Sequence, residues 1–514
     1  MHQHTVRVGT SHGVVEGFTR DGVNRWRSIP YAAPPVGPLR FRAPQPPQSW
    51  SGVLPCHAYG NCAPQQRRYT MTGVGKYQPM SENCLTLNVV TPRWSGPAPD
   101  GEALPVMFFI HGGGYILGSS ATPIYDGAHL ARAGCVYVSV NYRLGALGCL
   151  DLSSLSTKDI TIESNLFLRD IVAALRWVRE NIAAFGGDPE KVTIFGESAG
   201  AHAVATLLAV PDSKGLFAQA ISQSPASGMV GSPEVAAEFA NRFVGELGAD
   251  PANAAQAVLR ARPADLVRAM DTVMMTSMDS MAGAAPVGPT HSDEYLPLDP
   301  FEAMRQGVAQ KVPLIVGTNA DEGKLFTRFL KLLPTTEHAI ERMLAHTSPE
   351  VRERVLAAYP HYPHPKACVQ FGGDMIFNTA AWQIAEAHAK LAPTYVYRYD
   401  FAPRTLHWAG LGATHATELL AVFGIYRSRV GAVLTAGVDQ RVAVKVSHQV
   451  QNRWNEFART GVPGDDWPVY NKEERPVLVF DRHTHVEYDP HPHRRQAWAD
   501  FSLAGAPAPD TLDR

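Results

Sequence analysis

The chain has 514 residues, of which 45% are hydrophobic and 18% charged, so it holds enough apolar material for a large buried core. Its 46 lysines and arginines nearly balance its 48 aspartates and glutamates, and no run of like charges stands out, which argues against nucleic acid as a partner. No segment reaches the roughly 18 apolar residues of a membrane span. The N-terminus also lacks the pattern of a secretion signal. We therefore expect a cytoplasmic protein without a membrane partner.

Short runs of β-branched and aromatic residues alternate with longer helical patterns. This alternation predicts a mostly parallel, twisted sheet with helices on both faces. Between the second and third runs, apolar residues recur at steps of three and four from Ile171 to Phe185, which predicts a crossover helix. The expected strands comprise residues 106–110, 136–140, 192–195, 314–316, 395–399 and 477–480.

Three regions of the chain depart from this alternation. Gly17 and several prolines interrupt short apolar stretches in the first 40 or so residues, so we expect an antiparallel, loop-rich segment that caps one edge of the sheet. Mainly helical patterns fill residues 236–310 and 325–390, with no clear linker on either side. We therefore predict one domain over residues 1–514, with these two regions as helical insertions.

A candidate nucleophile follows the strand at 192–195. Residues 196–200 read Gly-Glu-Ser-Ala-Gly, and a helix of small residues comes next. A strand, a tight turn and a helix are the context that Gly-x-Ser-x-Gly requires, because the turn leaves almost no room for side chains two residues on either side of the serine. This context predicts Ser198 as a nucleophile.

A second glycine motif follows the strand at 104–110. His111 is followed there by Gly112, Gly113 and Gly114, which expose backbone at the carboxyl edge of the sheet, where α/β proteins bind ligands. Attack on an ester carbonyl builds negative charge on oxygen, and fixed N–H groups stabilise that charge. We expect the donors of this oxyanion hole to be Gly113, Gly114 and Ala199. A phosphate-binding loop would need a following Lys-Ser or Lys-Thr, which is missing.

Further motifs occur in order along nearly the whole chain: Ile-Pro-Tyr-Ala at 29–32, Ser-Glu-Asn-Cys-Leu at 81–85, Asn-Tyr-Arg at 141–143 and Phe-Gly-Gly-Asp-Pro at 185–189. With the two glycine motifs, they make the chain resemble the type-B carboxylesterase and cholinesterase family. In character it is similar to bacterial para-nitrobenzyl esterases. The resemblance implies an α/β-hydrolase fold and a serine esterase that uses no metal or organic cofactor.

The resemblance also assigns the remaining catalytic residues. The family's acid lies in a segment like residues 317–323, which implies Glu322, although from chemistry alone Asp321 could orient an imidazole equally well. The family's histidine lies in a segment like residues 411–419, which implies His415. The order serine, acid, histidine fits the hydrolase fold. His111 is a rival among the 20 histidines, but we expect it to be structural.

These residues predict a carboxylic ester hydrolase that works through an acyl-enzyme intermediate. We expect a broad range of uncharged small-molecule esters, extending to aryl esters or carbamates, and a monomer or weak homo-oligomer. Two alternatives stay open: a non-catalytic binding module of the same fold, and a lipase for longer acyl chains. No tryptophan lies between Cys62 and Cys84, where cholinesterases carry the indole that holds choline, so choline esters are disfavoured.

The resemblance further implies two structural ion pairs, Arg40 with Glu82 and Arg143 with Asp170. It matches Cys84 to a disulfide cysteine, with Cys62 as the natural partner and Cys56 as the spare, but a reducing compartment would keep the thiols free. Methionines cluster at positions 270, 274, 275, 278 and 281. They fit either an adaptable substrate pocket or ordinary helix packing.

Overall fold

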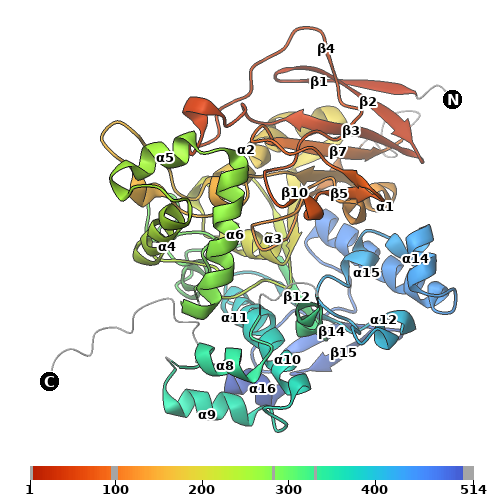
Figure 1. Cartoon of the computed structure of the whole chain (residues 1–514). Helices are drawn as coiled ribbons and strands as arrows, with labels where there is room; N and C mark the ends of the chain where they lie inside the picture. The colour runs from red at the N-terminus through yellow and green to blue at the C-terminus, as the bar shows by residue number, and fades with distance from the viewer. Residues whose placement is uncertain are drawn as a thin grey trace.

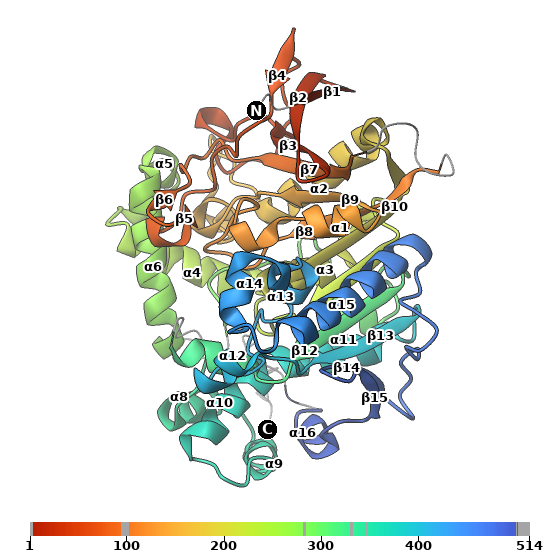
Figure 2. The same ribbon diagram turned by 90° about the vertical axis from the view of Figure 1, so that its right-hand side faces the viewer.

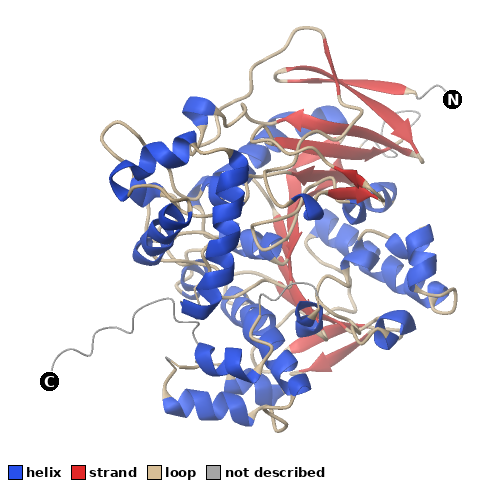
Figure 3. Ribbon diagram, in the orientation of Figure 1, coloured by secondary structure: helices blue, strands red, loops and turns tan. Residues whose placement is uncertain are grey.

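The computed structural model describes residues 4–93, 102–280, 284–328, 333–345, 347–499 and 501, with residues 277–280 described by their backbone alone. Its centre is a large twisted sheet that runs through the whole molecule (Figure 3). Across the sheet, the strands follow the order β1 (Thr5–Thr10), β2 (Gly13–Arg20), β3 (Val23–Pro30), β7 (Thr86–Pro92), β9 (Val136–Val140), β8 (Leu104–Ile110), β10 (Gly187–Glu197), β11 (Gln219–Gln223), β12 (Leu314–Asn319), β13 (Thr394–Tyr399), β14 (Pro476–Phe480) and β15 (His485–Tyr488).

The middle of the sheet, from β9 to β14, is parallel, whereas the strands at both edges pair antiparallel. The expected parallel sheet and the antiparallel opening segment are thus both confirmed. There are two short additions among the described residues: β4 (Val53–Pro55) pairs with β2, in this case parallel, while β5 (Met71–Gly73) and β6 (Lys76–Tyr77) form a separate hairpin. All six expected strands are present.

Helices cover both faces of the sheet (Figure 1). In β8, Phe108 and Ile110 point into the core under α2 (Leu166–Asn181) and α3 (Ala199–Leu207). Phe109, between them, packs on the other face with residues of α1 (Ala128–Arg132), α13 (Leu419–Val422) and α15 (Gln440–Thr460). This alternation follows from the two-residue period of a strand, and it explains why the parallel strands read as continuous apolar runs.

The two regions expected to be insertions are indeed mainly helical. They lie on the left and at the bottom of Figure 1, and none of the described helices of the chain is long and apolar enough to cross a membrane. The first region holds α4 (Pro233–Glu246), α5 (Ala254–Arg260), α6 (Pro263–Ser280) and α7 (Pro300–Arg305). The second holds α8 (Glu337–Met343), α9 (Pro349–Ala357), α10 (Pro365–Gly373), a π-helical turn (Asp374–Asn378) and α11 (Thr379–His388).

Strand β11 was not expected from the sequence. Its residues read Gln-Ala-Ile-Ser-Gln, so it lacks the apolar run of the other parallel strands, although all five residues are buried. The strand is recognisable only from its pairing with β10 and β12 on either side.

Both ion pairs implied by the family resemblance are present. Arg40 Nη2 lies 2.5 Å from Glu82 Oε1, and Arg143 Nη2 lies 2.6 Å from Asp170 Oδ1. The arginine and the carboxylate are largely buried in each pair, so losing one partner would leave an uncompensated charge in the core. The six cysteines are all buried free thiols, and so the possible bridge from Cys62 to Cys84 is not formed in this structure.

Candidate active site

Ser198 occupies the sharp turn between β10 and α3. Its backbone has φ 59° and ψ −124°, a combination that costs energy for any residue other than glycine. The turn is also too tight for side chains, since a Cβ on Gly200 would lie 2.1 Å from the Ile110 carbonyl oxygen and one on Gly196 would lie 2.6 Å from the Gly200 carbonyl. The chain thus holds the serine in a strained backbone conformation at the carboxyl end of a central strand.

The second glycine motif forms a loop directly after β8. Gly113 has φ 114°, and a Cβ there would lie 2.1 Å from the Leu117 carbonyl oxygen, so only glycine fits. His111 stacks on the Tyr142 ring at a centroid distance of 4.5 Å, and its Nδ1 lies 2.8 Å from the Gly112 carbonyl oxygen. Burial lowers the pKa of His111 to about 4, which keeps it neutral. This histidine therefore supports the glycine loop.

His415 and Glu322 are brought together from separate segments. The Nδ1 of His415 lies 2.6 Å from Glu322 Oε2, and both side chains are buried. The other carboxylate oxygen accepts hydrogen bonds from Ser224 Oγ at 2.6 Å and from the backbone N–H of Asn319 at 2.7 Å. Asp321, the competing carboxylate, instead pairs with Lys324 Nζ at 2.8 Å. Of the two adjacent acids, Glu322 is therefore the one that can orient the imidazole.

A second carboxylate meets the other side of the imidazole. His415 Nε2 lies 2.9 Å from Oε1 of Glu197, the residue before Ser198. If Nδ1 donates its proton to Glu322, the contact at Nε2 needs a proton on either Nε2 or the Glu197 carboxylate, because two lone pairs would repel. Burial lowers the pKa of His415, but the charges of Glu197 and Glu322 outweigh it and raise the pKa well above the usual value. The serine motif contains Glu197, but nothing in the sequence pattern indicated that its side chain belongs to the site.

A third buried glutamate, Glu418, completes this acidic cluster. Its Oε2 accepts a hydrogen bond from Asn319 Nδ2 at 2.6 Å. Burial, followed by the charges of Glu197 and Glu322, raises the pKa of Glu418 to about 8, so it holds a proton at neutral pH. Sequence reasoning missed this residue too, because only the fold shows that three carboxylates converge.

Aromatic rings fix the plane of the imidazole. Phe377 stacks on His415 with a centroid distance of 4.3 Å and an interplanar angle of 27°, and Phe326 packs at 5.2 Å. Phe377 belongs to the π-helical turn Asp374–Asn378, a widened turn that leaves backbone carbonyls without their usual helical partners. Ser227 takes up two of them: its N–H donates to the Ile376 carbonyl at 2.7 Å and its hydroxyl to the Met375 carbonyl at 2.8 Å.

Ser198, His415 and the glycine loop line one cavity of about 320 Å³. Glu197 also belongs to this lining, which is otherwise mostly apolar. Ala199 is buried and begins α3, where the first N–H groups of a helix lack helical partners. The apolar wall includes Leu117, Met229, Leu325, Phe326, Met343 and Phe377.

The methionine cluster divides between its two possible roles. Met274 lines the cavity, whereas Met270 is buried in the core and Met275 is exposed. The side chain of Met278 and the whole of Met281 lie outside the described residues. Within the described chain, no group of three or more histidines, cysteines or acids is arranged to hold a metal ion.

Known proteins match this chain over almost its whole length. The sequence pattern of the carboxylesterase family matches residues 4–498. The chain belongs to the carboxylesterase family. It is 37% identical over 499 residues to the para-nitrobenzyl esterase of Bacillus subtilis, covering 95% of this chain and 97% of the relative. It is 32% identical over 487 residues to the phenmedipham hydrolase of Pseudarthrobacter oxydans, covering 91% of this chain and 94% of the relative.

The fold agrees with this assignment. A solved structure of PNB esterase superposes with a TM-score of 0.84 at 35% identity and covers 97% of this chain and 99% of its own. The chain is thus a carboxylic ester hydrolase with the α/β-hydrolase fold, as the sequence motifs predicted.

Proposed function

We propose that this esterase hydrolyses uncharged carboxylic esters through a triad of Ser198, His415 and Glu322. The observation that carries the proposal is the 2.6 Å contact of His415 Nδ1 with Glu322 Oε2, beside a strained serine that lines the same cavity. In the reaction, His415 takes the proton of Ser198 as the hydroxyl attacks the ester carbonyl, and Glu322 stabilises the resulting imidazolium.

The negative charge that develops on the carbonyl oxygen needs fixed donors. We assign these to the backbone N–H groups of Gly113, Gly114 and Ala199. Their support is the location of the two glycines in the cavity lining and of Ala199 at the N-terminus of α3. His415 then gives its proton to the leaving alcohol, and a water activated by the same histidine releases the acid from Ser198.

The contact of His415 Nε2 with Glu197 affects this cycle. Ser198 can pass its proton only to an imidazole whose Nε2 is unprotonated, and the negative charge of Glu197 opposes that state. We propose that Glu197, in direct contact with Nε2, stabilises the imidazolium formed during attack. Glu418, which holds a proton at neutral pH, limits the total negative charge of the cluster.

The substrate class follows from the cavity walls. A volume of about 320 Å³ is typical of a small-molecule site, and the mostly apolar lining favours uncharged acyl and alcohol groups of moderate size. The relatives named para-nitrobenzyl esterase and phenmedipham hydrolase support aryl-containing esters and related acyl derivatives such as carbamates.

The test is hydrolysis of a para-nitrophenyl ester series from acetate to palmitate by wild type, Ser198→Ala and the exposed control Ser51→Ala. Activity should disappear only in Ser198→Ala, and an organophosphate should label Ser198 alone in the other two proteins. Maximal rates with palmitate would support the lipase alternative. A folded wild type that hydrolyses none of the esters and takes up no label would refute the proposed mechanism.

A further inference from the structure

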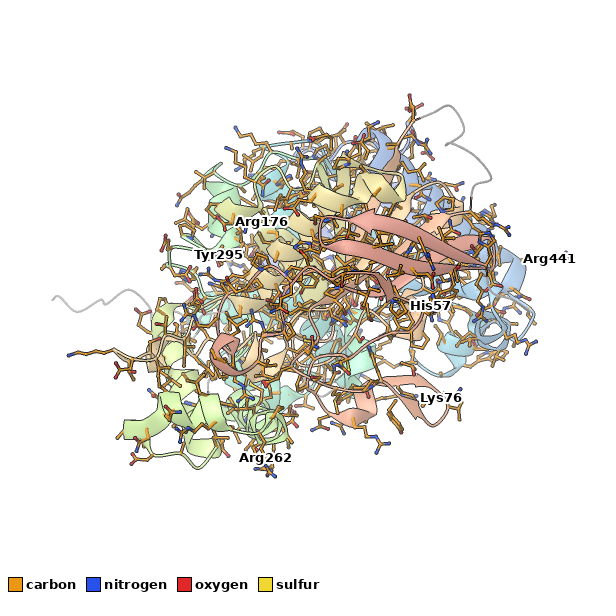
Figure 4. All side chains as sticks on the ribbon, turned by 90° about the horizontal axis from the view of Figure 1, so that it is seen from above. His57, Lys76, Arg176, Arg262, Tyr295 and Arg441 are labelled. Atoms are coloured by element: carbon orange, nitrogen blue, oxygen red, sulfur yellow. The ribbon has the colours of Figure 1, made fainter. Side chains whose placement is uncertain are left out.

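The surface formed by residues 404–448 has an unusual charge pattern. Every exposed charged side chain in this segment is basic, although acids and bases are nearly balanced over the whole chain. Its two acidic residues, Glu418 and Asp439, are both buried. The exposed lysine and arginine residues are Arg404, Arg427, Arg429, Arg441 and Lys445. In Figure 4, Arg441 lies at the outer edge of the molecule.

The same surface exposes large apolar side chains. Trp408 and Val433 are 77% and 78% exposed, and Val430 and Val438 are exposed by more than half. We call the exposed residues of α12 (Arg404–Trp408), α14 (Arg429–Leu434) and the start of α15, with Val438 before it, the α12–α14 surface. A single exposed apolar side chain is ordinary, but a cluster of them indicates an interaction site.

The two short helices form one surface because direct contacts hold them together. Thr405 Oγ1 donates to the Leu434 carbonyl oxygen, and the Arg404 N–H donates to Asp439 Oδ2 at 2.8 Å. Arg482 Nη2 binds the other oxygen of Asp439 at 2.7 Å. The neighbouring positions of α12 and α14 are visible from two directions (Figures 1 and 2). Buried Asp439 thus fixes the base of the surface and adds no exposed negative charge.

We propose that the α12–α14 surface docks this esterase onto anionic lipid surfaces, from which it takes apolar ester substrates. An exposed tryptophan and aliphatic side chains among lysines and arginines match a lipid–water interface, where the ring and the aliphatic groups enter the boundary and the cations meet anionic headgroups. Peripheral docking of this kind needs no membrane-spanning helix. The proposal nevertheless departs from our expectation from the sequence that the protein has no membrane partner.

A second copy of the chain fits this surface less well. A symmetric dimer would place the same patch on both sides of the interface, so the cations would face one another. Within the described chain, Arg429, Arg441 and Lys445 take part in no ion pair that would neutralise them. Nucleic acid would satisfy the cations but would leave the three valines against phosphate, where apolar side chains gain little.

The surface is also connected to the proposed active site. From α12 the chain continues to Thr414, whose hydroxyl accepts a hydrogen bond from the Leu325 N–H at 2.7 Å, and then to His415. Leu325 and His415 both line the cavity. Docking through α12 would therefore bring the cavity near an interface in which apolar esters concentrate. The idea that the interface supplies ester substrates rests on the proposed function. The lipid binding does not, because it requires no hydrolysis.

The experiment measures sedimentation of the full chain with vesicles of phosphatidylcholine alone or mixed with phosphatidylglycerol. The test variant combines Arg429→Gln, Arg441→Gln and Lys445→Gln. The matched control combines Lys158→Gln, Lys214→Gln and Lys472→Gln, which removes the same charge from exposed positions elsewhere. Each interfacial cation contributes about fivefold in partitioning, so the test variant should bind mixed vesicles about 100-fold more weakly, and the control should bind nearly as well as wild type.

Trp408 supplies an independent readout. Brominated lipids in the mixed vesicles should quench part of the wild-type tryptophan fluorescence, and this part should be lost in Trp408→Phe. Ser198→Ala should bind the vesicles like wild type, and the triple test variant should hydrolyse soluble para-nitrophenyl acetate normally. A wild type that binds vesicles but hydrolyses no ester would refute the proposed function and leave the docking surface standing.

Three results would overturn the docking proposal. The first is equal binding of vesicles by wild type and the triple test variant. The second is a wild type that binds a DNA duplex but no anionic vesicle, which would identify the surface as a site for polyanions. The third is a concentration-dependent dimer that Val433→Asp abolishes while vesicle binding is absent, which would make the surface an interface between copies.

Discussion

His415 Nε2 lies 2.9 Å from Glu197 Oε1, so the residue directly before the proposed nucleophile contacts the proposed base. The negative charge of Glu197 helps to raise the pKa of His415, in opposition to burial. A base with a raised pKa loses its proton only at higher pH. The acid limb of the rate profile of this esterase should therefore reflect Glu197.

The first prediction concerns Glu197→Gln. Removing the charge should lower the pKa of His415, so that the imidazole becomes an unprotonated base at lower pH. The acid limb of kcat/KM against pH should then move to lower pH, as measured with para-nitrophenyl acetate. Glu246→Gln, at an exposed position on α4, should leave the profile unchanged. An acid limb that stays in place or moves to higher pH in Glu197→Gln would contradict the electrostatic role.

Glu418 provides a prediction about stability. Its pKa is about 8 in the folded protein and close to the ordinary 4.5 in the unfolded chain, so the folded state binds more protons between these values. Stability contributed by this proton is complete below about 4.5 and is lost as the pH rises through 8. The loss is on the order of a few kcal/mol in the limiting case, at about 1.4 kcal/mol per pKa unit.

Glu418→Gln should remove this dependence, because the amide is neutral at every pH. Denaturant unfolding measures this effect. The free energy of unfolding of Glu418→Gln, minus that of wild type, should increase as the pH rises from acidic values to above 8. The exposed control Glu246→Gln should follow wild type throughout. A constant difference between Glu418→Gln and wild type across this range would show that Glu418 is ionised in the folded state.

The sequence was sufficient for the parts of this protein that depend on local patterns. Most of the parallel strands are apolar runs, the glycines at 196 and 200 are forced by close backbone contacts, and the family motifs pointed to Glu322 and His415. The α/β-hydrolase fold and the ester hydrolase class are confirmed by the relatives. The single domain and the roles of the site residues stay predictions.

Features that depend on convergence of distant segments were not predictable. Glu197 and Glu418 lie 221 positions apart. Glu418 is only three residues from His415, but Glu197 joins them only because β10, β12 and the segment before α13 end at the same edge of the sheet. Strand β11 carries two glutamines, so nothing in its composition indicates a central strand. The π-helical turn that presents Phe377 reads locally as an ordinary helix.

Gly113 is the next position to test. Alanine there would place a Cβ 2.1 Å from the Leu117 carbonyl oxygen at φ 114°, so the loop must shift. Displacing one oxyanion donor typically costs about 3 kcal/mol of barrier, and kcat for Gly113→Ala should fall about 100-fold or more. Gly215→Ala also has a positive φ but has no atom within 4 Å of the added Cβ, so it should retain normal kcat. Unchanged kcat in folded Gly113→Ala would remove this glycine from the oxyanion hole.

The last prediction concerns Phe377, whose ring stacks on the imidazole of His415 at a centroid distance of 4.3 Å. The aromatic face should hold the plane of His415 and stabilise its protonated form, and such stacking is worth about 1 kcal/mol. Phe377→Leu should therefore lower kcat for para-nitrophenyl acetate about fivefold, with little change in KM since the acetyl group is small. Phe371→Leu, which loses a buried ring packed against Tyr359 and Trp498, is the matched control for lost packing. If both variants lowered kcat equally, or if Phe377→Leu raised only KM, the ring would be a wall of the cavity and not a support for the base.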